Sequence, residues 1–318
     1  MRGLVARLNL QRFFIGEGPQ SGEIILTRRR IYILPTRSGM IFGFILFAML
    51  LAAMNYNNSM AHALTFLLAS LAVVSILHGY RNLHGLRFTA GRSAGVFAGE
   101  RLSFPVQVSN PDGRRRPAIK IGWPREAPLC IDLPPAGGQW VHLERPATRR
   151  GRHTMGRFTV YTRYPLGLFH AWSHLEFDRH GLVYPTPAAA QPFPHTLATE
   201  TEESNGQGRG VDDFAGLRAY APGDSLRHVH WKTLAKERGV MTKQFAGGQA
   251  PELIFAWDLL NGMDTEARLS MLCRWVLDAE RLGLRYGLHL PQAQLPVDSG
   301  AAHRHQCLTA LALFGQQD

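Results

Sequence analysis

Hydrophobic residues are concentrated in one uncharged stretch near the start of the chain. No Asp, Glu, Lys or Arg occurs between Ser38 and Tyr80. Within this stretch the runs 40–54 (MIFGFILFAMLLAAM) and 61–77 (AHALTFLLASLAVVSIL) are apolar, and residues 55–59 (NYNNS) between them are turn formers. Each run is close to the roughly 17 residues that a helix needs to cross the hydrocarbon core of a bilayer. The pattern predicts a transmembrane hairpin of two α-helices over residues 38–80.

Two other interpretations of this stretch are a buried helical hairpin in a soluble protein and a cleaved signal peptide. A soluble hairpin normally carries a charged face at helical period, and none is present here. A signal peptide would begin nearer the N-terminus and would not be followed at once by a second apolar run. Arginines precede the first run, in the basic N-terminal segment 1–37, and follow the second run, whereas the connecting loop is uncharged. By the positive-inside rule we expect a two-pass protein of the inner (cytoplasmic) membrane with both termini cytoplasmic.

Residues 81–185 contain short apolar alternations that are separated by Gly and Pro. The segments 102–108 (LSFPVQV) and 158–162 (FTVYT) alternate at period two, which is typical of a β-sandwich. We therefore predict a β-rich, sandwich-like domain over 81–185. The segments 149–153 (RRGRH) and 162–169 (TRYPLGLF) are predicted as turns between edge strands, with an interaction surface as the alternative.

The chain changes character after residue 185. Residues 186–210 are rich in Pro, Ala, Thr, Glu, Ser and Gly without apolar periodicity, so a linker is expected there. Residues 251–318 then alternate strand and helix patterns, which predicts a small α/β unit with a parallel sheet. The expected elements are a strand at 251–258, a helix at 265–282, a strand at 285–290 and a helix at 301–314. In such sheets ligands bind at the C-terminal ends of the strands, where Asp258 would lie.

Charge and cysteine content narrow the choice of partners. The chain has 35 Lys and Arg against 24 Asp and Glu, a net charge of +11, which suits an anionic partner. Lipid headgroups are favoured over nucleic acid, because arginines lie beside the membrane segment and no nucleic-acid-binding motif accompanies them. The three cysteines are odd in number and far apart, which predicts reduced thiols rather than a disulfide framework or a metal knuckle.

The densest polar cluster lies in the segment 211–250. Residues 222–223 (Pro-Gly) are the expected centre of a type II turn, because Pro fixes φ and Gly accepts a positive φ. Asp224 follows the turn and is placed to accept hydrogen bonds from the backbone or from an arginine. A structural ion pair between Asp224 and Arg218 or Arg227 is the favoured interpretation.

A metal site is the alternative interpretation of the same segment. If the chain after the turn is extended, His228 and His230 project from one face at metal-compatible spacing. Together with Asp224 they would form the metal site of a metal-assisted hydrolase. A serine hydrolase is not favoured, because Ser225 lacks the context of a nucleophile elbow.

Four segments together resemble the domain-of-unknown-function 58 family, the MoxR-associated bacterial membrane proteins. They are 32–39 (YILPTRSG), 149–152 (RRGR), 164–169 (YPLGLF), and 218–224 (RAYAPGD) with 230–232 (HWK). They occur in the order of the family, so the resemblance covers nearly the whole chain, and the last is the most specific.

The resemblance implies a von Willebrand factor A-like fold at the C-terminus, which would be truncated here. It implies a working association with a MoxR-type AAA+ ATPase, often in gene clusters that also encode a transglutaminase-like membrane protein. No established catalytic activity comes with it. The candidate functional surface, which we call the signature cluster, consists of Arg218, Tyr220, Pro222, Gly223, Asp224, Arg227, His230, Trp231 and Lys232. A structural role at the junction of the two soluble units is the alternative for these residues.

One departure from the von Willebrand A pattern concerns its metal-ion-dependent adhesion site. That site needs Asp-x-Ser-x-Ser, because a carboxylate and hydroxyls supply the oxygen ligands that Mg²⁺ prefers. Residues 258–262 read Asp-Leu-Leu-Asn-Gly, so both hydroxyls are missing. Asp258 remains a candidate Mg²⁺ ligand, with Asp264, Thr265 and Asp298 as further oxygen donors, but no cofactor is expected.

The sequence therefore favours a non-enzymatic, membrane-anchored scaffold or adaptor. It would work with a MoxR-type AAA+ ATPase in the assembly or remodelling of envelope-associated proteins. The alternatives are the metal-assisted hydrolase and a binder of an anionic polymer through the arginine clusters at 114–116 and 149–152.

Overall fold

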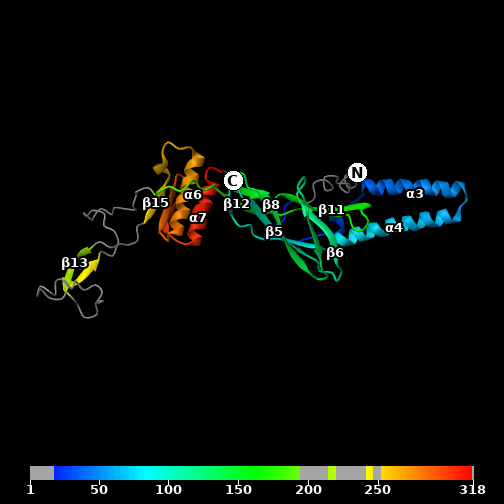
Figure 1. Ribbon diagram of the computed structural model, residues 1–318, viewed down its shortest axis with the longest axis horizontal. Helices are drawn as coiled ribbons and strands as arrows, with labels where there is room; N and C mark the ends of the chain where they lie inside the picture. The colour runs from blue at the N-terminus through cyan, green and yellow to red at the C-terminus, as the bar shows by residue number, and fades with distance from the viewer. Residues whose placement is uncertain (1–17, 194–213, 220–240, 246–251, 317–318) are drawn as a thin grey trace, which may run out of the picture. The chain divides into compact units, whose positions relative to one another are not determined.

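The structure is a computed structural model that describes residues 18–193, 214–219, 241–245 and 252–316 (Figure 1). The chain divides into two compact units, Met1–Val183 and Tyr184–Asp318.

Two apolar helices, α3 (Arg37–Asn55) and α4 (Ser59–Leu83), form a hairpin in the first unit (Figure 1). Their mean hydropathies are 1.9 and 2.1, so both are long and apolar enough to cross a membrane. Only 6% of the apolar window of α3 and 11% of that of α4 is buried. A core helix of a soluble protein would be mostly buried, so this exposure disfavours the soluble-hairpin alternative. The predicted pair of long apolar helices is thus confirmed, and α4 continues beyond Tyr80.

Both helices begin at capping side chains. The Thr36 hydroxyl accepts a hydrogen bond from the Gly39 amide at 3.1 Å, and the Asn58 side chain accepts from the Met60 and Ala61 amides at 3.0 and 3.2 Å. These bonds satisfy amides of the first turn, which have no partner within the helix. The tight connection at residues 56–58 follows from the cap at Asn58 and from the left-handed backbone of Asn57, whose φ is +46°.

The remainder of the first unit is built of antiparallel strands. The order of the four-stranded sheet is β1 (Ile24–Ile25), β3 (Arg87–Ala90), β5 (Arg101–Ser109) and β8 (Gly138–Pro146). That of the five-stranded sheet is β2 (Tyr32–Pro35), β11 (Phe169–Glu176), β10 (Arg157–Thr162), β6 (Arg116–Gly122) and β7 (Leu129–Leu133). A small third sheet contains β4 (Val96–Phe97), β12 (His180–Tyr184) and β9 (Gly151–Thr154), and the 3₁₀ turn η1 (Arg28–Arg30) precedes β2.

One hydrophobic core joins the sheets. Along β5 and β10 every second residue is buried, as the period-two pattern predicts. Phe88 and Phe104 from the four-stranded sheet and Phe158 from the five-stranded sheet belong to the same buried cluster. Leu83, at the end of α4, belongs to it too and is fully buried.

The hairpin is an insertion within the strand region. Strand β2 leads directly into α3, and α4 leads into β3, so the chain on each side of the hairpin forms part of a sheet. Residues before the first helix, among them Ile24 and Leu26, are buried in the core. The β-rich region therefore includes strands from segment 1–37, which the sequence assigned to a separate basic N-terminal segment.

The turn predictions need one correction. Residues 163–168 do join two strands, but β10 and β11 lie in the interior of the five-stranded sheet and are not edge strands. Period-two patterning fixes which face of a strand is buried, whereas its place in the sheet depends on long-range pairing. The segment 149–153 leads into β9, which lies at the edge of its three-stranded sheet.

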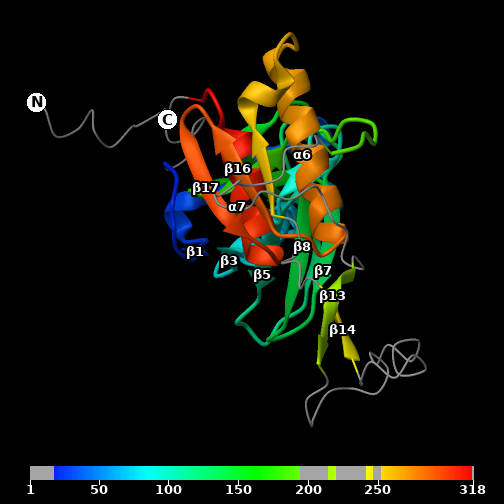
Figure 2. The ribbon, with the colours of Figure 1, turned by 90° about the vertical axis from the view of Figure 1, so that its left-hand side faces the viewer.

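The second unit contains a small sheet and two helices. Its elements are β15 (Leu253–Ala256), the 3₁₀ turn η3 (Trp257–Leu260), α6 (Thr265–Arg281), β16 (Tyr286–Leu290), β17 (Ala293–Asp298) and α7 (Ala301–Leu313). The two helices lie beside the sheet (Figure 2). The helical pattern of residues 265–282 places Leu269, Leu272, Cys273, Val276 and Leu277 on one face; the first four are buried in α6, and Leu277 is partly buried.

The sheet of the second unit is only partly parallel. Strands β15 and β16, which α6 connects along the chain, pair in parallel. Strands β16 and β17 are antiparallel. Strand β17 was not predicted; it lies at the edge of the sheet, where Pro296 is tolerated within the alternating run 293–298. The strands β13 (Phe214–Ala219) and β14 (Met241–Phe245) form a further antiparallel pair. Among the described residues, the predicted all-parallel sheet is therefore limited to one strand pair.

The first residues of the predicted linker 186–210 pack within the second unit. The Ala188 amide donates a hydrogen bond to the Ser270 carbonyl at 3.0 Å, and the Phe193 ring stacks on Phe255 with centroids 5.8 Å apart. The Cys273 thiol lies 3.4 Å from the Pro185 carbonyl oxygen. Residues 194–210 lie outside the described residues.

The burial of the cysteines gives a test of both units. Cys130 is exposed on β7, whereas Cys273 and Cys307 are buried, and burial raises the pKa of both thiols to about 12. Because the thiolate is the reactive form, we expect one rapidly modified thiol per native chain and three after denaturation. Titration with a disulfide reagent in mild detergent measures this number. The Cys130→Ser variant should show no rapid reaction, and fast native labelling of Cys307 would contradict the assigned packing.

Candidate functional site

The structure describes only part of the signature cluster. Arg218 lies in β13. The other members, Tyr220, Pro222, Gly223, Asp224, Arg227, His230, Trp231 and Lys232, lie outside the described residues, as does His228. The predicted ion pair and the predicted metal site at Asp224 therefore stay predictions.

The candidate Mg²⁺ ligands lie at separate places in the second unit. Asp258 is exposed in η3, directly after β15, as expected for the C-terminal end of that strand. Asp264 precedes the first residue of α6, and Asp298 ends β17. Over the ranges that the structure describes, no group of three or more His, Cys, Asp or Glu side chains could hold a metal ion.

Two of the quoted segments meet where the hairpin joins the sheets. We call this contact the junction; it consists of residues 32–39, 79–83 and 162–169. Strand β2 pairs with β11 in antiparallel register, with Pro35 opposite Phe169. The Thr36 amide donates to the Leu168 carbonyl at 2.9 Å, and its hydroxyl donates to the Gly167 carbonyl at 2.7 Å. Thr36 therefore caps α3 and ties its first turn to the turn before β11.

Gly39 allows the backbone of α3 to approach this turn. A Cβ atom at this position would lie 2.0 Å from the Leu168 carbonyl oxygen, far inside van der Waals contact. One turn further along the same helix, a Cβ atom at Gly43 would meet nothing within 4 Å. The turn itself uses a second glycine, Gly167, whose φ of +72° lies in the left-handed region. The glycines in the segments 32–39 and 164–169 thus serve one contact.

The end of α4, residues 79–83, is the third segment of the junction. The buried Asn82 amide donates to the Pro117 carbonyl at 2.7 Å and to the Thr162 hydroxyl at 3.1 Å. Thr162 donates in turn to the Ala118 carbonyl at 3.1 Å. Because an unpaired buried amide costs about 1–3 kcal/mol, these bonds fix α4 to β6 and β10. A Cβ atom at Gly79 would lie 3.4 Å from the Tyr164 carbonyl oxygen, so α4 also lies close to the turn.

The solvent side of the junction combines apolar and basic side chains. Leu34, Tyr164 and Leu166 are 47%, 38% and 50% exposed, and Arg37 and Arg163 beside them in the chain are exposed as well. Apolar and aromatic side chains together with arginine are characteristic of the water interface of a bilayer. This composition is compatible with a position of the junction beside a membrane surface.

A row of rings lies on the outer face of the five-stranded sheet, next to the junction. The centroids of Tyr161 and His170 are 5.0 Å apart, and those of His170 and Trp172 are 5.2 Å apart. Burial, and then the charge of Arg163, lowers the pKa of His170. This imidazole is consequently neutral at neutral pH, so the row adds packing to the sheet rather than charge.

Sequence reasoning identified the segments of the junction but not their contact. It singled out residues 32–39 and 164–169 separately and missed the role of Asn82. One signal was available, because Asn82 is a polar, non-ionised residue at the end of an otherwise apolar helical run. What it bonds to depends on strands that lie 35 and 80 residues further along the chain.

Comparison with known proteins gives limited information. No model of a known protein family matches the chain. The chain is 25% identical over 173 residues to a protein named "Uncharacterized protein YeaD" from Bacillus subtilis (strain 168). The match covers 52% of this chain and 43% of that relative, so it spans less than half of the relative's length. The printed name states no activity.

The close backbone contact at Gly39 can be tested against its neighbour in the same helix. Gly39→Ala should destabilise the first unit by roughly 1–3 kcal/mol, because the added methyl group collides with a backbone atom. Gly43→Ala should leave stability unchanged or raise it by up to about 1 kcal/mol, since alanine favours the helix. Urea unfolding in mild detergent, followed by near-UV circular dichroism, measures both. Equal effects of the two substitutions would show that the contact does not constrain the junction.

Proposed function

We propose that the chain is a non-enzymatic, membrane-anchored scaffold of the domain-of-unknown-function 58 family. In this proposal it works with a MoxR-type AAA+ ATPase, and in some settings with a transglutaminase-like membrane protein, to assemble or remodel envelope-associated proteins. The observation that carries the proposal is the insertion of the apolar hairpin between β2 and β3. A flexible tether would leave the soluble part free to turn, whereas this connection fixes it.

The rigidity of the connection supports a mechanical role. Leu83 is buried in the core of the strand region, and Asn82 bonds two strands. Thr36 and Gly39 hold the other helix against the turn before β11. A force applied to the strand region is thus transmitted to both helices rather than to a linker. A scaffold on which an ATPase acts needs such a connection, since a loose tether would absorb the motion.

The dimensions of the hairpin support a two-pass arrangement. At about 1.5 Å per residue, the 19 residues of α3 extend about 28 Å, close to the roughly 30 Å of a bilayer core. Both ends of the hairpin continue into strands of one compact unit, so the flanking segments lie on the same side of a membrane that the hairpin crosses. By the positive-inside rule, the arginines at 28–30, 37, 81 and 87 support the proposal that this side faces the cytoplasm.

The C-terminal unit is proposed as the part that presents the partner surface. The parallel pair β15–β16, connected through α6, is compatible with a truncated von Willebrand A-like unit. The partnership with the ATPase rests on the resemblance of residues 218–224 and 230–232 to the family. The signature cluster is the proposed contact.

The proposed membrane topology can be tested by labelling one added cysteine. Tyr56 is 78% exposed in the loop between the helices, while the native Cys130 is exposed on β7. In the Tyr56→Cys variant, a membrane-impermeant maleimide applied to spheroplasts should label residue 56 but not Cys130. Permeabilisation should then allow the labelling of Cys130, which serves as the internal control. Labelling of Cys130 in intact spheroplasts, or of residue 56 only after permeabilisation, would contradict the proposed orientation.

The partnership can be tested by affinity purification from membranes. A MoxR-type ATPase should co-purify with the full-length chain and be reduced at least about tenfold with Asp224→Ala/Trp231→Ala. The matched control is Asp178→Ala/Trp140→Ala, because both of these side chains are exposed in the first unit. Quantitative mass spectrometry gives the ratio. Absence of the ATPase from the wild-type sample, or equal loss in both double variants, would overturn the proposed contact.

A further inference from the structure

A polar cavity lies at the end of α4, on the side of the strand region where the chain leaves the hairpin. Its volume is about 450 Å³, and it is lined by Arg81, His84, Asp112, Gly113, Arg114 and Arg116. Arg81 and His84 come from the end of the helix, Asp112, Gly113 and Arg114 from the connection between β5 and β6, and Arg116 is the first residue of β6.

Arg116 is the central feature of this cavity. Its side chain is only 4% exposed, although a guanidinium group is always charged. Its Nε atom donates to the Asn110 side-chain oxygen at 3.3 Å, and Nη2 donates to the Asp112 carboxylate. Its Nη1 atom is buried and has no hydrogen-bond partner within the described ranges. A buried donor without an acceptor costs free energy, so the burial of Arg116 at this wall of the cavity is unusual.

The electrostatics of the cavity favour an anion. Three guanidinium groups, from Arg81, Arg114 and Arg116, share it with one carboxylate, that of Asp112. Burial lowers the pKa of Arg116, the Asp112 carboxylate raises it, and the charge of Arg114 lowers it again. The positive charge of the group is therefore not neutralised by Asp112 alone. Arg115 does not contribute, because it pairs with Asp132 at 2.7 Å.

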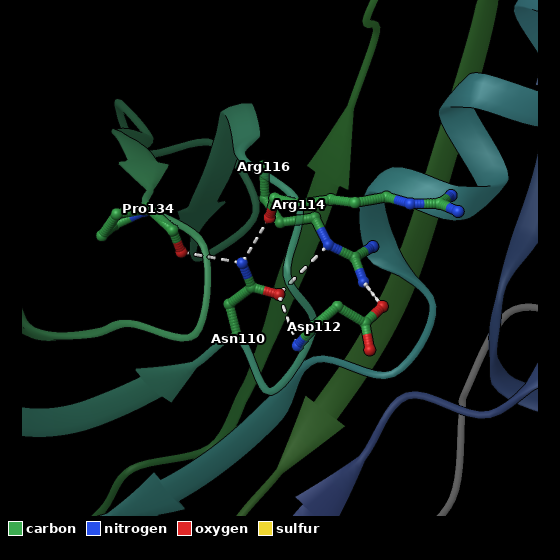
Figure 3. A network of polar contacts seen from close by, with 5 residues as sticks. All are labelled: Asn110, Asp112, Arg114, Arg116 and Pro134. Carbon is green, nitrogen blue, oxygen red and sulfur yellow. Dashed lines mark hydrogen bonds and ion pairs between the residues drawn. The ribbon is translucent and has the colours of Figure 1, made fainter.

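The cavity wall is held in place by Asn110, which is 1% exposed. Its side-chain amide donates to the carbonyls of Arg114 and Pro134 at 2.7 and 2.8 Å. Its side-chain oxygen accepts from the Asp112 amide at 3.3 Å as well as from Arg116. Figure 3 shows this network, with the side chains of Arg114 and Arg116 extending to the same side. Such a frame orients the two arginines before a ligand arrives, which lowers the entropic cost of binding.

The position along α4 indicates where the anion comes from. The exposed apolar part of the helix ends near His78, and Gly79, Asn82 and Leu83 are buried in the junction. Arg81 is three residues beyond His78, a rise of about 4.5 Å. The headgroup layer on each side of the hydrocarbon core is roughly 5–7 Å thick. In a membrane-inserted hairpin, Arg81 therefore lies at the depth of the phosphates of lipid headgroups.

We propose that the cavity formed by Arg81, Arg114 and Arg116 binds a phosphate group, supplied by the headgroup of an anionic phospholipid. Guanidinium groups bind phosphate oxygens in bidentate geometry, and basic pockets at the cytoplasmic ends of transmembrane helices are suited to such headgroups. The bound phosphate pairs with the exposed Arg81 and Arg114 beside the buried Arg116 and connects α4 to the segment between β5 and β6. The lipid source rests on the proposed membrane insertion, whereas the phosphate site itself does not.

The test uses the full-length protein and a neighbouring pair of arginines. Arg114→Gln removes an exposed side chain of the cavity, and Arg115→Gln removes the adjacent exposed arginine that faces Asp132. In detergent, inorganic phosphate is titrated at constant ionic strength and binding is measured by calorimetry. We expect Arg114→Gln to weaken binding roughly tenfold, because it removes a charge-assisted hydrogen bond, and Arg115→Gln to leave it unchanged.

A second arm identifies the source of the phosphate. Native mass spectrometry of protein released from nanodiscs of phosphatidylcholine, with or without phosphatidylglycerol, should show bound phosphatidylglycerol for wild type and Arg115→Gln but less for Arg114→Gln. Phosphate binding in detergent without lipid retention would overturn the lipid source and leave a soluble phosphate compound as the ligand. If wild type binds neither, or if both variants bind as wild type does, the site is refuted. Neither result depends on the ATPase, so failure of the scaffold proposal is seen separately.

Discussion

The structure of the first unit depends on close packing between the ends of the apolar hairpin and the strand region. The first turn of α3 approaches the Leu168 carbonyl so closely that only glycine fits at position 39. At the other end, α4 carries a buried asparagine whose amide bonds two structural neighbours, Pro117 and Thr162. A buried polar group is costly unless it is paired, so the bonds of Asn82 specify one arrangement of α4. The close approach at Gly39 does the same for α3, because a larger side chain would collide there. The hairpin is thereby part of the fold of the strand region rather than an appendage.

The three arginines at 114–116 lie in different environments within this arrangement. The net charge of +11 suggests a uniformly basic protein, yet neighbouring arginines in the run 114–116 have different environments. Arg115 pairs with Asp132, Arg116 is buried against Asp112, and Arg114 lines the cavity beside the end of α4. Arg114 lies in the bend before β6, whereas Arg116 is the first residue of that strand.

The junction and the cavity together describe how an anchored protein can be held in a defined orientation. Exposed apolar side chains at the turn before β11 face the level where the helices emerge, and the cavity lies at the end of α4. Two helices alone would fix the depth of the protein but not its tilt relative to the membrane. Under the proposed membrane insertion, additional contacts at the headgroup layer would restrict that tilt.

The sequence by itself determined the elements whose signals are local. The uncharged stretch gave the two helices, period-two alternation gave the strands, and the buried face of α6 followed from 3.6-residue spacing. Only the tertiary structure decided that the hairpin interrupts the strand region, that β10 and β11 are interior strands, and that β17 makes an antiparallel pair. It also decided which arginine is buried. These features depend on pairing between distant segments, and a local pattern specifies which face of a strand or helix is buried but not the partner that buries it.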